Sequence, residues 1–320
     1  MAEQLGLDEL RAHALDNIGT ARIQSGDLGG LQDFEDSIAI ALRANAPAEV
    51  CRAQNNLAAM LWEQGQLVRA KTVSDEAAQA ASRFGQVAFG RWFRAIEIVR
   101  QYALGHWQEA AGAADDFIAE VEAGSPHYLA SGCYLVRAEI RLSRDELSTA
   151  LADAERALEL ARLAKDPQNL DQRAAKLTHV FYEIGMVDRA AELADELLPK
   201  LRAGRDAGAG IDALHMLAWT LTALGRGKEL LDFLPRRDSG WVRAAMELAT
   251  GRLREAADIC ASMGAAVDAA HDRLSLAETL VKQARRAEAD TELHRALDFY
   301  RSVGATRYIR RGEVLLAASA

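Results

Sequence analysis

The sequence predicts an all-α protein folded as a helical solenoid, and two observations carry that prediction. The composition favours helix, because 50% of the 320 residues are hydrophobic, only 5 are proline, and Ala, Leu, Glu and Arg recur throughout. Short turn motifs also recur at a nearly constant interval of 39 or 40 residues through the first six units. A fixed period in this range is typical of helix pairs stacked into a superhelix.

Each repeat is expected to be two antiparallel helices joined by a tight turn. About fourteen residues of helical pattern lead to each turn, as CRAQNNLAAMLWEQG does at Gly65, and a small residue follows five positions after it. Glycine permits the reversal, and alanine lets the two helix axes approach closely. The small residues at that position are Ala70, Ala110, Ala150, Ala190, Ala256 and Ala289, with Leu31 and Leu230 as exceptions.

Eight turns predict eight helix pairs in a single repeat domain over residues 1–320. The predicted turns lie at Gly26, Gly65, Gly105, Asp145, Gly185, Gly225, Gly251 and Ala284. The last two intervals shorten to 26 and 33 residues, so units seven and eight should be compact. Residues 306–320 should form a helix that caps the final apolar face. Residues 2–10 match the end of a second helix whose partner would precede them, and residues 201–212 form the loosest linker.

The repeat pattern resembles the tetratricopeptide repeat, most closely at Asn56, Leu57, Ala58, Leu61, Gly65, Ala70 and Ala77. The closing segment ALDFYRSVGATRYIRRGEVLLAASA (296–320) is similar to the last repeat and capping helix of large bacterial ATPase-linked signalling proteins. Those proteins combine such an array with an adenylate/guanylate cyclase domain or a LuxR-type helix-turn-helix. The resemblance implies a right-handed superhelix in a bacterial regulator, with a neighbouring ATPase or output domain as a partner.

The net charge and the cysteine pattern disfavour several classes of partner and indicate the cellular compartment. The net charge of −9 disfavours binding to nucleic acid or to an anionic membrane surface. No apolar run approaches the length of a membrane span, and the N-terminus lacks the features of a secretory signal. Cys51, Cys133 and Cys260 are widely spaced and odd in number, which predicts buried reduced thiols and a cytoplasmic protein.

The sequence contains no catalytic or cofactor motif. The phosphate-binding pattern GxxxxGK[ST], the metalloprotease pattern HExxH and the hydrolase pattern GxSxG are all absent, and the seven histidines are spread over different units. We therefore expect neither an enzyme nor a cofactor nor a metal site. The basic cluster Arg301, Arg307, Arg310 and Arg311 is expected to pair with neighbouring carboxylates rather than with nucleic acid.

A helical superhelix offers its inner surface for binding, through one face of each first helix. Positions 13, 10, 6 and 3 before each turn share that face, because steps of three and four stack on a helix. In units five and six they place His179, Tyr182, His215 and Trp219 on one groove wall. A second patch combines Arg52, Asn55, Trp62, Trp92 and Tyr102, where Arg and Asn could hold a carboxylate. The alternative is that the aromatic side chains pack on the next repeat and belong to the core.

Units three and four break the core pattern. Glu97, Gln101, Arg137 and Arg141 occupy positions where other units have Leu or Phe. Because equivalent positions in neighbouring units face each other, we predict a partly buried polar layer in which Glu97 pairs with Arg137 and Gln101 with Arg141.

Three functions follow from these observations. The leading prediction is a non-catalytic interaction and sensing module that captures a protein or peptide in the groove. One alternative is an array that binds a small-molecule inducer there, and another is a structural oligomerisation scaffold. A closed apolar pocket would favour the inducer, a wide polar groove the peptide, and a self-complementary outer face the scaffold.

Overall fold

The computed structural model describes residues 7–202, 210–234 and 238–317. In these residues the chain forms sixteen α-helices and one 3₁₀ helix, with no strand. The prediction of an all-α, tetratricopeptide-like right-handed solenoid is confirmed. No described helix is both long enough and apolar enough to cross a membrane.

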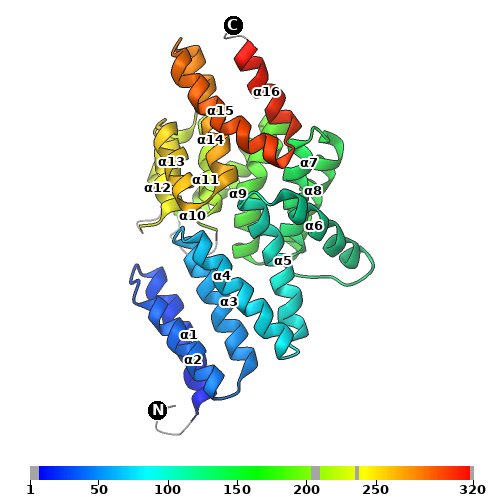
Figure 1. Cartoon of the computed structure of the whole chain (residues 1–320), viewed down its shortest axis with the longest axis vertical. Helices are drawn as coiled ribbons and strands as arrows, with labels where there is room; N and C mark the ends of the chain where they lie inside the picture. Colours follow the sequence, from blue (N-terminus) through cyan, green and yellow to red (C-terminus); the bar gives the residue numbers. More distant parts are fainter. Residues whose placement is uncertain (1–6, 203–209, 235–237, 318–320) are drawn as a thin grey trace.

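Eight helix pairs and a capping helix follow one another along the chain, as predicted (Figure 1). The first helices of the pairs are α1 (Asp8–Gln24), α3 (Pro47–Glu63), α5 (Val87–Ala103), α7 (Ala130–Ser143), α9 (Pro167–Ile184), α11 (Ala213–Ala223), α12 (Gly240–Ala249) and α14 (Ala266–Lys282). The second helices are α2 (Gly30–Arg43), α4 (Leu67–Arg83), α6 (Trp107–Glu122), α8 (Leu147–Leu163), α10 (Val187–Arg202), the 3₁₀ helix η2 (Gly227–Asp232), α13 (Leu253–Met263) and α15 (Arg286–Val303). The cap is α16 (Thr306–Ala317).

The turns lie at the predicted residues and use the left-handed backbone conformation. Six are glycines with positive φ, and Asp145 and Ala284 adopt φ of 64° and 59° in the equivalent position. The alanines five residues after the turns are all completely buried, which confirms their role in close helix packing. Residues 8–10 lie in α1, the first helix of a pair, so the expectation of a second helix is wrong for them.

The predicted pairing in the polar layer is wrong. Arg137 pairs with Asp153 at 2.8 Å and with Asp115 at 3.1 Å, and Arg141 pairs with Asp153 at 2.7 Å. Asp153 lies on α8, the second helix of their own unit, and Asp115 lies on α6, the second helix of the preceding unit, so neither arginine pairs with Glu97 or Gln101 of α5.

Glu97 pairs instead with Lys71 of α4 at 3.3 Å. Glu97 and Gln101 line a hollow of about 580 Å³ between α4, α5 and α6, where small residues such as Ala78, Ala81 and Ala113 leave room. The third unit therefore has the polar side chains of Glu97 and Gln101 beside an open space.

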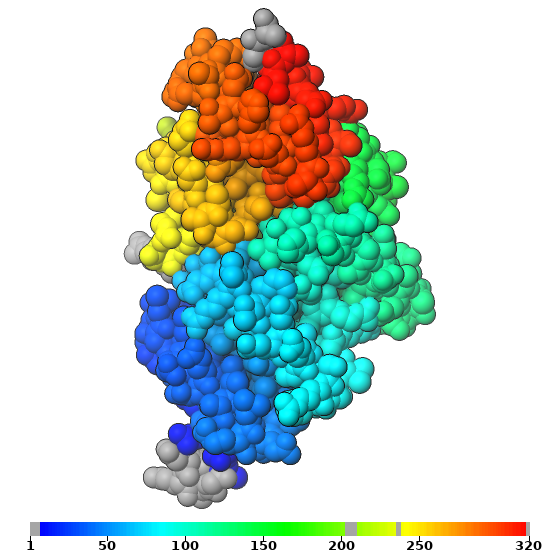
Figure 2. Space-filling model, in the orientation of Figure 1, coloured from blue at the N-terminus to red at the C-terminus, as the bar shows by residue number. Residues whose placement is uncertain are grey.

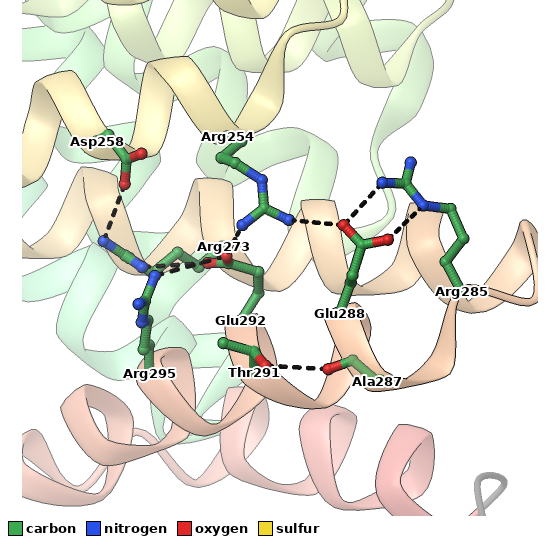
Figure 3. Close-up of polar contacts among 9 residues, drawn as sticks. All are labelled: Arg254, Asp258, Arg273, Arg285, Ala287, Glu288, Thr291, Glu292 and Arg295. Atoms are coloured by element: carbon green, nitrogen blue, oxygen red, sulfur yellow. Dashed lines mark hydrogen bonds and ion pairs between the residues drawn. The ribbon is translucent and has the colours of Figure 1, made fainter.

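The last units repeat the arginine-to-second-helix arrangement. Glu292 of α15 is almost fully buried and pairs with Arg273 of α14 at 3.1 Å and with Arg254 of α13 (Figure 3). Arg254 also reaches Glu288 at 3.5 Å. One carboxylate thus joins three helices, which holds the compact seventh and eighth units together.

The superhelix closes on itself, so that the last units rest on the first ones. Trp241 of α12 donates its indole N–H to the backbone oxygen of Trp62 at 2.8 Å, and Ser239 donates to the backbone oxygen of Glu63 at 2.5 Å. At the next turn Gly65 packs against Met263, and a Cβ there would lie 2.5 Å from the sulfur. In the space-filling view the yellow to red units lie directly on the cyan and green ones (Figure 2).

The cap α16 completes this closure with the basic cluster. Arg307 reaches Asp145 at 3.2 Å and Glu183 at 3.3 Å, both at turn ends of earlier units. Arg311 pairs with Glu183 at 3.1 Å and with Glu278. Arg310 also pairs with Asp145, and Arg301 with Glu313 at 3.2 Å. The expectation that these four arginines pair with carboxylates is confirmed.

Candidate functional site

A pocket of about 240 Å³ opens on the first helices of units two, three and five. Its lining residues come from α3 (Asn55, Ala59, Trp62, Glu63), α5 (Trp92, Ala95, Ile96, Val99, Arg100), α9 (Gln172, Arg173) and the positions Leu129, Gly210 and Asp212. The α3 and α5 residues include six at the positions expected for the inner face: Asn55, Ala59, Trp62, Trp92, Ala95 and Val99. We call this site the inner pocket.

Two tryptophans form a fixed aromatic wall of the inner pocket. Trp92 donates its indole N–H to the side-chain oxygen of Asn55 at 3.0 Å and stacks on Tyr128, with ring centroids 5.7 Å apart. Trp62 packs against Trp241, with centroids 6.5 Å apart. Because each ring is held by a second contact, the wall presents apolar area at little cost in conformational entropy.

Arg100 brings a buried guanidinium to this wall. The residue is only 5% exposed, and its guanidinium carbon lies 5.8 Å from the centre of the Trp62 ring. Within the described part of the chain it makes no hydrogen bond or ion pair. Burial lowers the pKa of Arg100 to about 10, against the weaker opposing effects of Glu97 and Asp75. A buried charge left in this state is unfavourable unless a partner reaches it.

Arg173 brings a second guanidinium from α9. It is 6% exposed, and its Nε has no hydrogen-bond partner among the described residues. Burial lowers its pKa, with Asp212 as the main opposing charge. Asp212 is itself occupied, because it accepts hydrogen bonds from Lys176 at 2.8 Å and Gln172 at 2.9 Å. The inner pocket therefore suits an anionic group, held by two guanidiniums beside an aromatic wall.

Two residues of the predicted second patch lie outside the inner pocket. Arg52 is engaged with Glu49, at 3.2 Å. Tyr102 is buried and stacks on Trp107, with centroids 5.2 Å apart. Of that patch, the structure brings together Asn55, Trp62 and Trp92.

The predicted groove wall of units five and six is covered rather than open. His179, His215 and Trp219 are 2%, 0% and 6% exposed, because α14 packs across them. Trp219 donates to the hydroxyl of Ser275 on α14 at 3.1 Å. Tyr182, half-buried, contacts the edge of Trp219. The expectation of an open wall is wrong here, because the superhelix closes and its last units fill this stretch.

His215 lies between two carboxylates of α14. Its Nε2 is 2.9 Å from Asp272 and its Nδ1 is 3.0 Å from Asp268. Burial opposes the charged ring, but Asp272 and then other neighbours including Asp268 outweigh it and hold the pKa of His215 well above its ordinary value.

The pKa of His179 is shifted in the opposite direction, downward, and this shift predicts a loss of stability in acid. Burial lowers its pKa to about 4, despite Glu183 and Asp268 nearby, and Arg311 and His215 add to the lowering. Between about pH 6.5 and 4 the unfolded chain, whose histidine has an ordinary pKa, therefore binds a proton on this ring, whereas the folded protein does not. The contribution of His179 to the free energy of unfolding is therefore complete above about pH 6.5 and is lost as the pH falls towards about 4.

We expect the titration of His179 to lower the free energy of unfolding by about 2 kcal/mol when the pH falls from 7 to 5. Urea denaturation at the two pH values measures it, with the His179→Gln variant as reference because it lacks the titrating ring. An equal pH dependence in both proteins would contradict the assignment.

The arrangement defines a paired-helix repeat solenoid with a charged, aromatic pocket on its first helices. Among solved structures it is similar to a Rap protein complexed with competence and sporulation factor, with a TM-score of 0.62 and 14% identity. That match covers 95% of this chain and 99% of the Rap chain. A circular tandem repeat protein with a novel repeat topology also matches at 17% identity over 99% of this chain and 88% of its own, but with a TM-score of only 0.24.

The sequence matches no protein-family model and no curated protein. At this level of identity, the likeness to the Rap structure establishes the helical-repeat fold.

Proposed function

We propose that this chain is a non-catalytic interaction and sensing module of a bacterial cytoplasmic regulator. It binds a protein segment or peptide in the inner pocket, through a carboxylate and an adjoining apolar side chain. Its partner in the regulator is a neighbouring ATPase or output domain. The observation that carries the proposal is that Arg100 and Arg173, both buried and without an ion-pair partner in the described residues, line one pocket.

The size of the inner pocket favours a peptide over a whole small-molecule inducer. Pockets for drug-sized ligands usually hold about 300–1,000 Å³, whereas this one holds about 240 Å³. A single side chain or a chain terminus fits that volume, with the rest of the segment lying along the first helices. The Rap complex supports the proposal by precedent, since a protein of the same fold binds a factor.

Arg100→Met is expected to weaken binding while stabilising the protein. Methionine keeps an unbranched apolar stem beside Trp62 but removes an unpaired buried charge, so we expect the unfolding free energy to rise by roughly 1–3 kcal/mol. Peptides selected on the wild type from a random library with free C-termini should bind the variant at least about tenfold more weakly, because a charged hydrogen bond is lost.

Arg94→Ala is the matched control, because Arg94 lies on the same helix but is exposed and pairs with Glu120 at 2.6 Å. It should leave the affinity unchanged. Selected peptides that bind Arg100→Met as tightly as the wild type would refute the proposal, as would peptides that carry no carboxylate. Selection of no peptide, together with saturable binding of a small organic acid, would instead favour the inducer function.

A further inference from the structure

A second cluster of ligating side chains lies in the interior of the last three units, apart from the inner pocket. His215 of α11, Cys260 of α13 and Asp272 of α14 are all completely buried. One ligating atom of each lies within 4.8 Å of those of the other two. Three helices thus direct a nitrogen, a sulfur and an oxygen to one point.

We propose that His215, Cys260 and Asp272 bind a divalent transition-metal ion, and that Zn²⁺ suits them best. Nitrogen, thiolate sulfur and carboxylate oxygen are the donors of protein zinc sites, with bonds of about 2.0–2.3 Å. Donors around a tetrahedral ion lie roughly 3.3–3.8 Å apart at those bond lengths. Side-chain adjustments of about 1 Å close the present cluster to that geometry.

An unused carboxylate oxygen points to a ligand independently. Oδ2 of Asp272 lies 2.9 Å from Nε2 of His215, but Oδ1 is buried and has no hydrogen-bond partner among the described residues. An orphaned buried carboxylate oxygen is costly, and a cation relieves that cost.

The surroundings of His215 are those of a metal-bound histidine. A ligating histidine usually directs its second ring nitrogen to a carboxylate, which fixes the orientation of the ring. Asp268 lies beside that nitrogen, 3.0 Å from Nδ1 of His215, at ion-pair distance but outside hydrogen-bond geometry, so a turn of the ring would complete this contact. Asp268 and Asp272 are one helical turn apart on α14, so one helix supplies both the ligand and the orienting group.

The charge of the cluster also permits a buried dication. The ion replaces one proton from the Cys260 thiol and one from the His215 ring, so the four side chains and the ion together carry the same net charge as the protonated side chains alone. The low-dielectric interior therefore gains no additional charge when the metal binds. Bound metal would hold α11, α13 and α14 together and add its binding free energy to the stability of the fold.

Cobalt provides the direct test, because a cobalt–thiolate bond has a characteristic charge-transfer absorption. The full chain is refolded from urea under reducing conditions with one equivalent of Co²⁺, since the buried site is best reached during folding. We expect the thiolate charge-transfer band, and we expect Zn²⁺ to raise the thermal midpoint of the same preparation by at least about 5 °C.

Cys260→Ala should abolish both signals, and Cys133→Ala is its matched control. Cys133 is also a completely buried thiol, and burial raises the pKa of both thiols to about 12, but Cys133 lies on α7. The wild type decides the question even if Cys260→Ala does not fold. A wild type with neither the cobalt band nor a zinc-dependent shift overturns the proposal, as does a band that persists in Cys260→Ala.

Discussion

Deleting residues 306–320 is expected to lower the unfolding free energy by roughly 3–5 kcal/mol and to promote aggregation. Tyr308 is buried among Tyr300 and His271, and Arg311 neutralises Glu183, whose side chain is only 6% exposed. Removing α16 exposes this apolar surface and leaves a buried carboxylate without two of its arginines. Thermal denaturation and light scattering of the truncated chain measure the two effects.

Arg301→Ala controls for the loss of an exposed ion pair between α15 and the cap α16. Arg301 pairs with Glu313 at 3.2 Å, and both side chains are about half exposed, so the pair should contribute little. A truncated protein that remains monodisperse with an unchanged thermal midpoint would show that α16 is not needed to close the array.

Trp219→Ala is expected to cost about 3–5 kcal/mol of stability, as large-to-small changes in a core do. The indole is 6% exposed, contacts the rings of His179 and Tyr182, and donates to Ser275. The earlier expectation from the sequence was different, since a groove residue would affect binding and leave stability intact. Chemical denaturation therefore separates the two interpretations.

Tyr182→Phe provides the comparison on the same surface. Its hydroxyl donates only a long hydrogen bond, 3.5 Å from the backbone oxygen of Ala223, so its removal should change stability by less than about 1 kcal/mol. If Trp219→Ala were as mild as Tyr182→Phe, the indole would not be part of the core.

The local architecture was predictable because it depends on short-range chemistry. A turn needs a residue in the left-handed conformation, and the 40-residue interval identified Asp145 even without glycine. Ala284 was identified from the repeat pattern around it, although its interval is shorter. The buried alanines were predictable as well, because each lies five residues after a turn. Unit six departs from the pattern, since Gly227–Asp232 forms a short 3₁₀ helix where a second α-helix was expected.

The candidate site was predictable only in part. The inner-face positions identified Asn55, Trp62 and Trp92, because a helical face follows from spacing alone. Arg100 and Arg173 fall outside those positions, and an arginine in a helix gives no signal that its head is buried. The burial of His179 and His215 depends on how far the superhelix has turned after six units. That angle is a sum of many small packing angles, which a sequence pattern does not contain.

The contact between Trp241 and Trp62 has a consequence for the order of folding. In an open repeat array each unit touches only its neighbours, so folding can start anywhere and proceed unit by unit. Here the indole N–H of Trp241 is bonded to a residue 179 positions earlier, and Arg307 reaches back 162 positions to Asp145. Such distant pairings are slow to form, because a long loop must close first.

A growing chain therefore finishes Trp62 and its surroundings only after most of the polypeptide has been made. Shortened arrays should not behave as smaller versions of the whole, and the two ends should unfold in one cooperative step. The protein combines the parts of a repeat array with the cooperativity of a globular domain.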